Sequence, residues 1–472
     1  MDVRLDGPTA QSQEGLIMPV SATATAAVCV AIFGVHYPGL KEYHIGISDG
    51  TSSGTELIYK VHENSIGAFN FTNAGKRVVF ENGDPRSGRE LWVTDGTKNG
   101  TRLLKDIYRG ATFSSDPSPK IGSNSFASSK NLAIFPATDN NNGRELWSTD
   151  GTAEGTTIVK DLLIGEASGI GITDKYVVSN GEKTYFRSRE TTFGLSLWST
   201  TGTSKSTRIA SNDGLNMNAL SGSAMLKNSL IFSYGRQLWI TEGTEKSAQM
   251  IHEIEGLGNF SNLTHQTDGR FVLFGSDTDQ HGREPWVTDG TADGTKLLKN
   301  LVPFDGNSDP GDWYDGGGFT VFSAIADGKG RELWVTKGNE KSTKLLMDVN
   351  KGPLGSIFYG FAKVGKSVVF VARVVEDIGS YNRLFATDGT PKGTKQLSSR
   401  AVVAPGQIQS LGKSAVYIDA RDGELWSTGL GFNRQKKVSN FGNKGGRREM
   451  FSIVYMTTVN LYQRGSKARP CP

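Results

Sequence analysis

The sequence predicts an all-β protein, a single large β-propeller of four-stranded blades, and three observations carry this prediction. A phrase of the form ELWxTDGTxxGT recurs along nearly the whole chain. Columns of aromatic residues keep a constant offset from each copy of the phrase. The apolar runs between glycine-rich turns are short and rich in β-branched and aromatic residues, which favours strands over helices. Four short strands per repeat, at this repeat length, are typical of propeller blades.

Copies of the phrase follow one another without a gap. Full copies of the Asp-Gly-Thr part begin at Asp49, Asp95, Asp150, Asp289 and Asp388, and altered copies begin at Thr201, Glu242, Lys337 and Thr428. Nine copies predict nine blades, with eight as the alternative if a terminal unit is incomplete. In the second unit we expect strands near residues 68–73, 76–82, 89–94 and 101–107.

The aromatic columns predict how the blades pack. Tryptophan stands just before the Asp-Gly-Thr part in most units, at Trp92, Trp147, Trp198, Trp239, Trp286, Trp334 and Trp426, while Phe385 and Gly46 occupy the same position in two others. A second column runs from Phe33 to Tyr417, and a third includes Phe71, Trp313 and Phe361. Since blades stack face to face around a ring, these side chains are expected to fill the space between them.

The repeated aspartates are expected to be structural. Aspartate accepts hydrogen bonds from nearby backbone N–H groups, and the glycine after it allows a positive φ. This turn chemistry predicts that Asp95, Asp150, Asp289 and Asp388 cap short hairpin loops and do not bind a ligand.

The organisation resembles the ELWxxDGT-repeat family of β-propeller-like proteins. The resemblance rests on ELWVTDGTKNGT, ELWSTDGTAEGT, EPWVTDGTADGT and ELWVTKGNEKST, and it extends from about Cys29 to Asn440. It implies a secreted or surface-associated repeat protein, and it implies no defined activity. An extracellular or cell-surface location is therefore expected, although no clear signal peptide is visible.

The two ends of the chain are expected to close the ring. Residues 1–27 form an N-terminal segment of undetermined structure, residues 28–464 form the propeller, and residues 465–472 form a short basic tail. The first unit lacks an inner strand, which residues 449–463 can supply, with residues 20–26 as the alternative source. Cys29 and Cys471 are the two cysteines of the chain, and a disulfide between them is one way to lock the closure.

Three acidic segments give two candidate sites. Asp305, Asp309, Asp312 and Asp315 lie in a turn-rich segment predicted to be a loop between blades, and they are a candidate ligand site. Asp139 and Asn141, with Asp277 and Asp279 at the equivalent place in another unit, are a candidate calcium site. The competing interpretation is a turn-rich solvated loop for the candidate ligand site and a hairpin turn for the candidate calcium site.

No catalytic constellation is visible, so no catalytic residue is assigned and a non-enzymatic role is favoured. We expect a non-catalytic scaffold that binds a protein or glycan ligand through loops between blades. The alternative is a carbohydrate-active hydrolase or lyase with acidic residues near the ring centre. We expect a monomeric ring with no cofactor other than calcium as the alternative above, no nucleic-acid partner and no transmembrane span.

Overall fold

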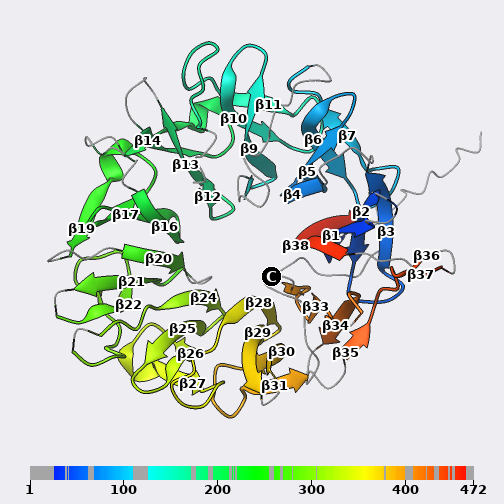
Figure 1. Ribbon diagram of the computed structural model, residues 1–472. Coiled ribbons are helices and arrows are strands. Elements are labelled where there is room, and N and C mark those ends of the chain that lie inside the picture. The colour runs from blue at the N-terminus through cyan, green and yellow to red at the C-terminus, as the bar shows by residue number, and fades with distance from the viewer. Residues whose placement is uncertain are drawn as a thin grey trace, which may run out of the picture.

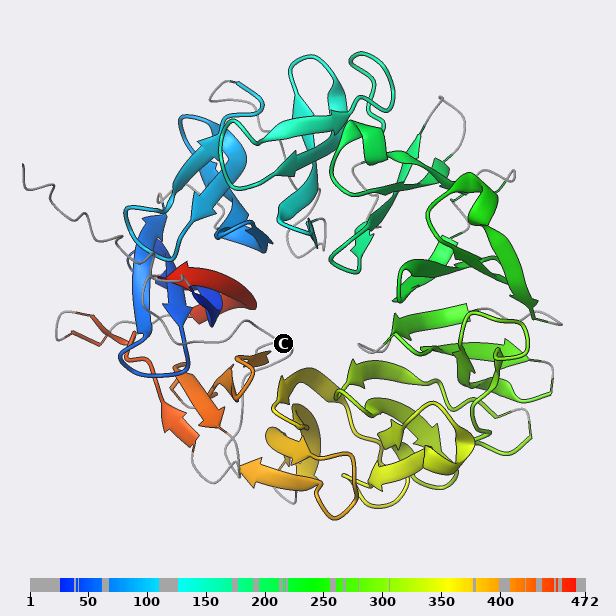
Figure 2. The same cartoon turned by 180° about the vertical axis from the view of Figure 1, so that it is seen from behind.

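Nine four-stranded antiparallel sheets are arranged in a ring in the computed structural model of the chain (Figures 1 and 2). The structure describes residues 26–37, 40, 42–61, 68–109, 126–171, 177–189, 195–211, 215, 217, 220–254, 260–265, 269–278, 280–304, 306–376, 379–398, 408–420, 422–429, 435–444, 447–448 and 452–463. The predicted nine-bladed propeller is confirmed. No helix among these residues combines the length and the apolar character that a membrane span needs.

The blades are given from the inner strand outward. Blade 1 is β38 (Ser452–Gln463), β1 (Ala26–Tyr37), β2 (Glu42–Ser48) and β3 (Thr55–Val61). Blade 2 is β4 (Ala68–Ala74), β5 (Arg77–Asp84), β6 (Gly88–Thr94) and β7 (Arg102–Lys105). Blade 3 is β8 (Ala127–Ser129), β9 (Leu132–Asp139), β10 (Gly143–Thr149) and β11 (Thr157–Lys160).

Blade 4 is β12 (Val177–Ser179), β13 (Thr184–Arg189), β14 (Leu195–Thr200) and β15 (Arg208–Ser211). Blade 5 is β16 (Leu220–Leu226), β17 (Ser229–Tyr234), β18 (Gln237–Thr241) and β19 (Gln249–Glu253). Blade 6 is β20 (Phe260–His265), β21 (Val272–Thr278), β22 (Gly282–Thr288) and β23 (Lys296–Leu297).

Blade 7 is β24 (Gly311–Asp315), β25 (Thr320–Ala326), β26 (Gly330–Thr336) and β27 (Lys344–Met347). Blade 8 is β28 (Phe358–Val364), β29 (Ser367–Glu376), β30 (Gly379–Thr387) and β31 (Lys395–Ser398). Blade 9 is β32 (Ile408–Ser410), β33 (Ser414–Ile418), β34 (Leu425–Gly429) and β35 (Gln435–Lys437). Outside the blades, β36 (Asn443–Lys444) pairs with β37 (Arg447–Arg448), and the short 3₁₀ helices η1 (Ser204–Ser206), η3 (Glu245–Ser247) and η4 (Glu340–Ser342) lie in loops.

The ring is closed by strands from opposite ends of the chain. β38 pairs antiparallel with β1, from Ala26 opposite Gln463 to His36 opposite Ser452. Each inner strand lies beside the inner strand of the next blade, and β38 completes the circle between β32 and β4. The predicted supply of the inner strand by residues 449–463 is therefore confirmed, and the alternative source at residues 20–26 is wrong, because Ala26 begins β1, the second strand of the blade.

The last blade also packs directly on the first. Phe33, Val35 and Tyr37 of β1 share one buried cluster with Leu425 and Phe441 of the C-terminal part. Cys29, also on β1, is disulfide-bonded, and the one other cysteine, Cys471, lies outside the described residues. Hydrophobic contacts and a covalent bond therefore both act on the strand that joins the two ends of the chain.

The aromatic columns fill the spaces between blades, as predicted. Phe80 is fully buried and Trp92 is 5% exposed, with ring centroids 6.4 Å apart. The same 6.4 Å separation recurs for Phe186–Trp198, Phe232–Trp239, Phe274–Trp286 and Phe322–Trp334. In blade 1, where Gly46 replaces the tryptophan, a Cβ would lie 2.3 Å from Cε2 of Phe33, so the phenylalanine ring occupies the space of the missing side chain.

The Asp-Gly-Thr loop is a capped turn, as its sequence predicts. Oδ1 of Asp150 accepts hydrogen bonds from the backbone N–H and the hydroxyl of Thr152, at 2.9 and 2.7 Å. A Cβ on Gly155 would lie 2.2 Å from the same Oδ1, so the aspartate excludes a side chain there. Three of the four altered copies that lack the aspartate have serine at the second glycine position, at Ser206, Ser247 and Ser342. In one of them, Oγ of Ser206 accepts from the N–H groups of Thr201 and Thr203 and so replaces the carboxylate.

Aspartate occurs with glycine in one form of the loop, and serine replaces the carboxylate in the other. The effects on stability of substitutions at Asp150 and Gly155 should therefore depend strongly on one another. Asp150→Thr removes the acceptor, and Gly155→Ser clashes with the carboxylate, so each substitution should lower the free energy of unfolding by about 1–3 kcal/mol. The double variant recreates the loop of the altered copies. Its loss of unfolding free energy should be smaller, by at least about 1 kcal/mol, than the sum of the losses in the two single variants. Chemical denaturation of the four proteins measures this difference, and strictly additive losses would contradict the assignment.

Candidate functional site

The acidic segment predicted as a loop between blades is partly a strand. Gly311–Asp315 forms β24, the inner strand of blade 7, because Trp313 stacks on Phe322 with ring centroids 4.5 Å apart. The Asp312 carboxylate accepts a hydrogen bond from the hydroxyl of Ser323 at 2.7 Å, and Asp315 accepts from the N–H of Gly317 at 2.7 Å. Asp305 lies outside the described residues.

Arginines join members of the two predicted acidic sets. Arg283 binds both oxygens of Asp277, at 2.7 Å from Nε and 2.9 Å from Nη2, and its Nη1 lies 3.6 Å from Asp309. Arg331 donates to the backbone oxygen of Asp309 at 2.8 Å and to the hydroxyl of Ser323 at 3.0 Å. The carboxylates of Asp277 and Asp309 therefore face cations of the protein itself, which makes this cluster an ion-paired link between blades 6 and 7.

The other half of the predicted calcium site is a hairpin turn. Asp139 accepts hydrogen bonds from the backbone N–H groups of Asn141 and Asn142, at 2.9 and 2.6 Å. Asp279 lies outside the described residues. In the part of the chain that the structure describes, no group of three or more histidine, cysteine, aspartate or glutamate side chains is arranged to hold a metal ion.

Buried glutamates are a feature that the sequence reasoning missed. They share the position two residues before the tryptophan column and are at most 2% exposed: Glu90, Glu145, Glu284, Glu332 and Glu424. Each carboxylate accepts a backbone N–H from the segment that follows the outer strand, as from Leu162 to Glu145 at 3.0 Å and from Leu301 to Glu284 at 2.9 Å. The number of residues between the glutamate and its N–H donor is the same in each of these units, and this constant spacing was the sequence signal that could have identified the buried glutamates.

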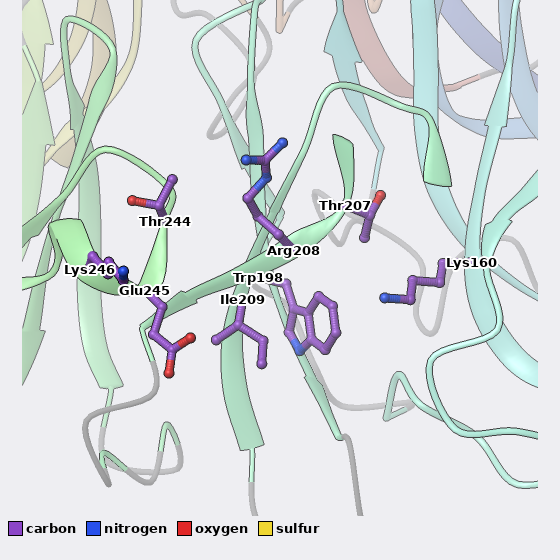
Figure 3. Close-up of a pocket in the computed structure, with 8 residues that line it drawn as sticks. All are labelled: Lys160, Trp198, Thr207, Arg208, Ile209, Thr244, Glu245 and Lys246. Atoms are coloured by element: carbon purple, nitrogen blue, oxygen red, sulfur yellow. The ribbon is translucent and has the colours of Figure 1, made fainter. Parts of the chain in front are cut away.

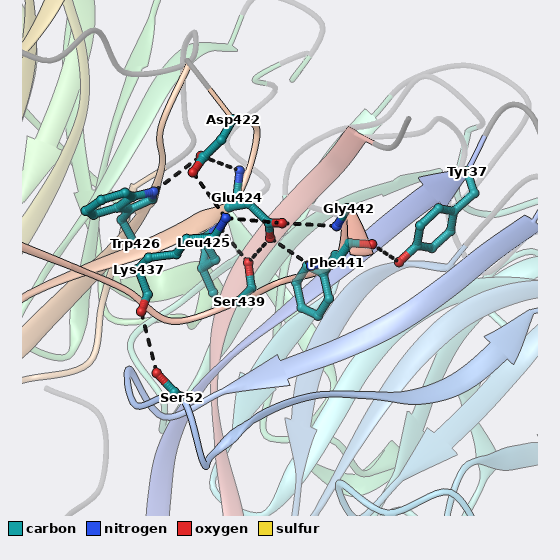
Figure 4. Close-up of polar contacts among 10 residues, drawn as sticks. All are labelled: Tyr37, Ser52, Asp422, Glu424, Leu425, Trp426, Lys437, Ser439, Phe441 and Gly442. Carbon is teal, nitrogen blue, oxygen red and sulfur yellow. Dashed lines mark hydrogen bonds and ion pairs between the residues drawn. The ribbon is translucent and has the colours of Figure 1, made fainter. Parts of the chain in front are cut away.

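Glu424 shows how this contact supports ring closure (Figure 4). Its carboxylate accepts the N–H groups of Phe441 and Gly442, at 2.9 and 3.0 Å, and a hydrogen bond from Ser439. The backbone oxygen of Phe441 in turn accepts the hydroxyl of Tyr37, on β1, at 3.1 Å. Burial raises the pKa of the Tyr37 hydroxyl to about 12, so it remains a donor at neutral pH.

A cleft of about 570 Å³ lies on the outer rim (Figure 3). It lies between the outer strands of blades 3 and 4 and a loop of blade 5, and it is lined by Lys160, Trp198, Thr207, Arg208, Ile209, Thr244, Glu245 and Lys246. Three cationic side chains and one carboxylate give the lining an excess of positive charge. The sequence reasoning did not identify this cleft, because its residues come from three units and occupy structural positions of the repeat.

Lys160 distinguishes the cleft from the equivalent places on other blades. The ammonium group of Lys105, at the same position of blade 2, donates to the backbone oxygen of Thr156 at 2.5 Å, and that of Lys299 donates to Thr343 at 3.2 Å. The ammonium group of Lys160 lies 4.9 Å from the centre of the Trp198 ring, closer than the 5.9 Å between Lys105 and the Trp147 ring, and the side chains of Lys160 and Trp198 point toward one another. Lys160 therefore presents its charge to the cleft.

Comparisons with known proteins found similarity to solved structures alone. No family model matches the chain, and no curated protein matches it, so membership of the ELWxxDGT-repeat family stays a prediction. A puromycin-hydrolyzing peptidase of Mycobacterium tuberculosis is 12% identical with a TM-score of 0.42, over 82% of this chain and 57% of that one. The tricorn protease is 12% identical with a TM-score of 0.40, over 87% and 46%. One structure from a study of two prolyl endopeptidases is 12% identical with a TM-score of 0.41, over 85% and 62%.

The predicted non-catalytic scaffold for a protein or glycan ligand is contradicted, because these three similar structures bear the names of proteases or peptidases. The prediction is corrected on this point. At 12% identity and TM-scores of 0.40–0.42 the likeness indicates no activity for this chain, which spans 46–62% of the length of those three proteins. No residue role is therefore transferred from them.

The buried glutamates predict how stability depends on pH. Burial raises the pKa of Glu145 from 4.5 to about 7, although backbone N–H donors partly oppose the rise. The folded protein then holds this proton more tightly than the unfolded chain, so the stabilisation is complete below pH 4.5 and is lost as the pH rises to about 7.

Between pH 4.5 and about 7, the unfolding free energy of the wild type should fall as the pH rises. In Glu145→Gln this fall should be smaller, by at most about 1.4 kcal/mol per pH unit. Glu154→Gln, an exposed glutamate of the same blade, is the matched control and should leave the slope unchanged. Urea denaturation at a series of pH values measures both slopes. Equal slopes for Glu145→Gln and the wild type would refute this role of burial.

Proposed function

We propose that the protein binds peptides that carry a carboxylate, holding them in the rim cleft as a step in peptide processing. The observation that carries this proposal is the combination in one cleft of three cations, an apolar floor and the outer strand β15, which pairs with no further strand among the described residues. The volume of about 570 Å³ suits an organic ligand of several residues rather than a small inorganic anion.

The cations would bind the carboxylate. Figure 3 shows the ammonium group of Lys160 pointing toward the ring of Trp198, with Ile209 on the same side of strand β15, while the guanidinium group of Arg208 extends from the opposite side of that strand. Arginine binds carboxylates in a bidentate geometry, and lysine acts as a point charge. An acidic group at either end of a peptide could therefore be bound while an apolar side chain contacts the floor.

The strand edge favours a peptide over a sugar. β15 is the outermost strand of blade 4, and its outer edge pairs with no other strand among the described residues. An unpaired edge offers alternating N–H and C=O groups that match an extended peptide and not a glycan. The names of the solved peptidases suggested peptides as the class to test, and their likeness adds no further weight.

The test is the binding of a fluorescent pentapeptide with an apolar side chain and a free C-terminal carboxylate, compared with its C-terminal amide. Lys160→Gln and Arg208→Gln should each weaken binding about 10-fold, because each removes one charge from the cleft. Arg102→Gln is the matched control, since Arg102 occupies the position of Arg208 on blade 2. Equal affinity for acid and amide, or binding unaffected by both substitutions, would disprove the proposal, as would tighter binding of an oligouronate of similar length.

A further inference from the structure

The turns between the first and second strands of the blades carry a cation in almost every unit. The residues are Lys76, Lys130, Lys183, Lys227, Arg270, Lys366 and Lys413, in blades 2, 3, 4, 5, 6, 8 and 9 respectively. Blade 7 has Gly316, Gly317 and Gly318 in this turn, and Lys363 of blade 8 reaches it, because a Cβ on Gly317 would lie 2.3 Å from Nζ of Lys363. We name these eight side chains the inner cationic ring.

The turns lie side by side around the centre of one face of the propeller. They connect the innermost strands to their neighbours (Figure 1). The N–H of Gly75 donates to the backbone oxygen of Asn131 at 2.6 Å, and that of Gly365 donates to Gly412 at 2.7 Å. The side-chain amide of Asn180 donates to the backbone oxygen of Lys227 at 2.9 Å. These bonds between blades hold successive cations at adjacent positions on the ring.

The charges of this ring are largely uncompensated. In the described part of the chain, no carboxylate forms an ion pair with Lys76, Lys130, Lys227, Lys366 or Lys413, and all five side chains are exposed. The acids of the described turns are Glu182 and Asp315, and Asp268 lies outside the described residues. Closely spaced charges of one sign sum to a potential that attracts a polyanion.

Two of the lysines occupy backbone positions that favour glycine. Lys130 has φ 56° and Lys227 has φ 54°, while Gly75 and Gly365 have φ 56° and 62° in the equivalent turns. A positive φ is uncommon for a residue with a side chain, and such outliers are concentrated at functional positions. These two turns therefore carry a cation at some conformational cost.

We propose that the inner cationic ring binds an acidic segment of polypeptide. The inner strands that begin or end at these turns present their inner edges to the ring centre, where an extended chain could find backbone partners. None of the turns offers an exposed aromatic side chain on which a nucleic-acid base could stack. The exposed apolar side chains Leu40, Ile164, Phe304 and Leu354 lie in connections on the opposite face, which argues against insertion of the cationic face into a membrane.

This site is separate from the rim cleft, and neither proposal depends on the other. The outer loops of the same face carry both signs of charge, as at Asp150 and Lys205, so the outer loops provide a control with the same change of net charge. Three exposed lysines from the ring, Lys76, Lys366 and Lys413, are compared with three exposed lysines from the outer loops, Lys98, Lys205 and Lys392.

The probe is a fluorescein-labelled peptide of glutamates, titrated with the full chain at low ionic strength and followed by fluorescence anisotropy. The triple variant Lys76→Gln, Lys366→Gln, Lys413→Gln should weaken binding on the order of 10-fold or more, and the outer triple variant less than about 3-fold. Added salt should weaken the wild-type complex. Thermal unfolding of both variants at the wild-type temperature confirms that the fold is intact.

Equal losses in the two triple variants would overturn the proposal, because the attraction would then reflect net charge alone. Binding of polygalacturonate or single-stranded DNA of matched charge as tightly as the glutamate peptide would overturn the assignment to polypeptide. Preference for the glutamate peptide together with selective loss in the ring variant would support it. The rim substitutions Lys160→Gln and Arg208→Gln should leave this binding within about 3-fold, which separates the two sites experimentally.

Discussion

The antiparallel pairing of β1 with β38 is the interaction on which the rest of the structure depends. A ring of blades that stack face to face leaves two exposed faces unless the last blade meets the first. Here the blade at the junction takes its inner strand from the C-terminal end and its other three strands from the N-terminal end. Phe33 and Tyr37 pack against the last blade, and Glu424 fixes the segment that receives the Tyr37 hydroxyl. The inner turns form a circle because this junction brings the two ends of the repeat together.

Much of the fold could be predicted from the sequence, because the repeat is written in residues whose roles are local. The tryptophan column, the Asp-Gly turns and the alternation of short apolar runs indicated four strands per unit and nine units. Replacements at two positions that compensate for one another were harder to interpret from one sequence. Replacement of the aspartate by Thr201 and of the glycine by Ser206 looked like decay of the phrase, but the structure shows a second way to cap the same turn. The buried glutamates were missed because their partners are backbone N–H groups, so the signal was a constant spacing in the chain and not a residue type.

The candidate sites were less predictable, because they are made by neighbouring blades. Asp309 and Asp312 drew attention as a local acidic cluster, whereas the structure shows an arginine beside one and a serine hydroxyl on the other. The rim cleft needs Lys160, Trp198 and Lys246 from three different units. The inner cationic ring is visible in the sequence only when the turns are aligned in register, because most units contribute a single lysine or arginine. In a repeat protein, residues that are equivalent in register can be neighbours in space, and these neighbours set the charge of a whole face.

Hydrogen exchange of the β1 amides tests ring closure most directly. The native full-length chain would be labelled in D₂O and the peptide covering residues 26–37 followed by mass spectrometry, beside the same experiment on a chain that ends at residue 448. We predict that β1 exchanges as slowly as the second strands of the other blades in the full chain, and much faster when β38 is missing. Exchange of β1 in the full chain at the rate of an exposed edge strand, or no change on removal of β38, would contradict a ring closed by these two strands.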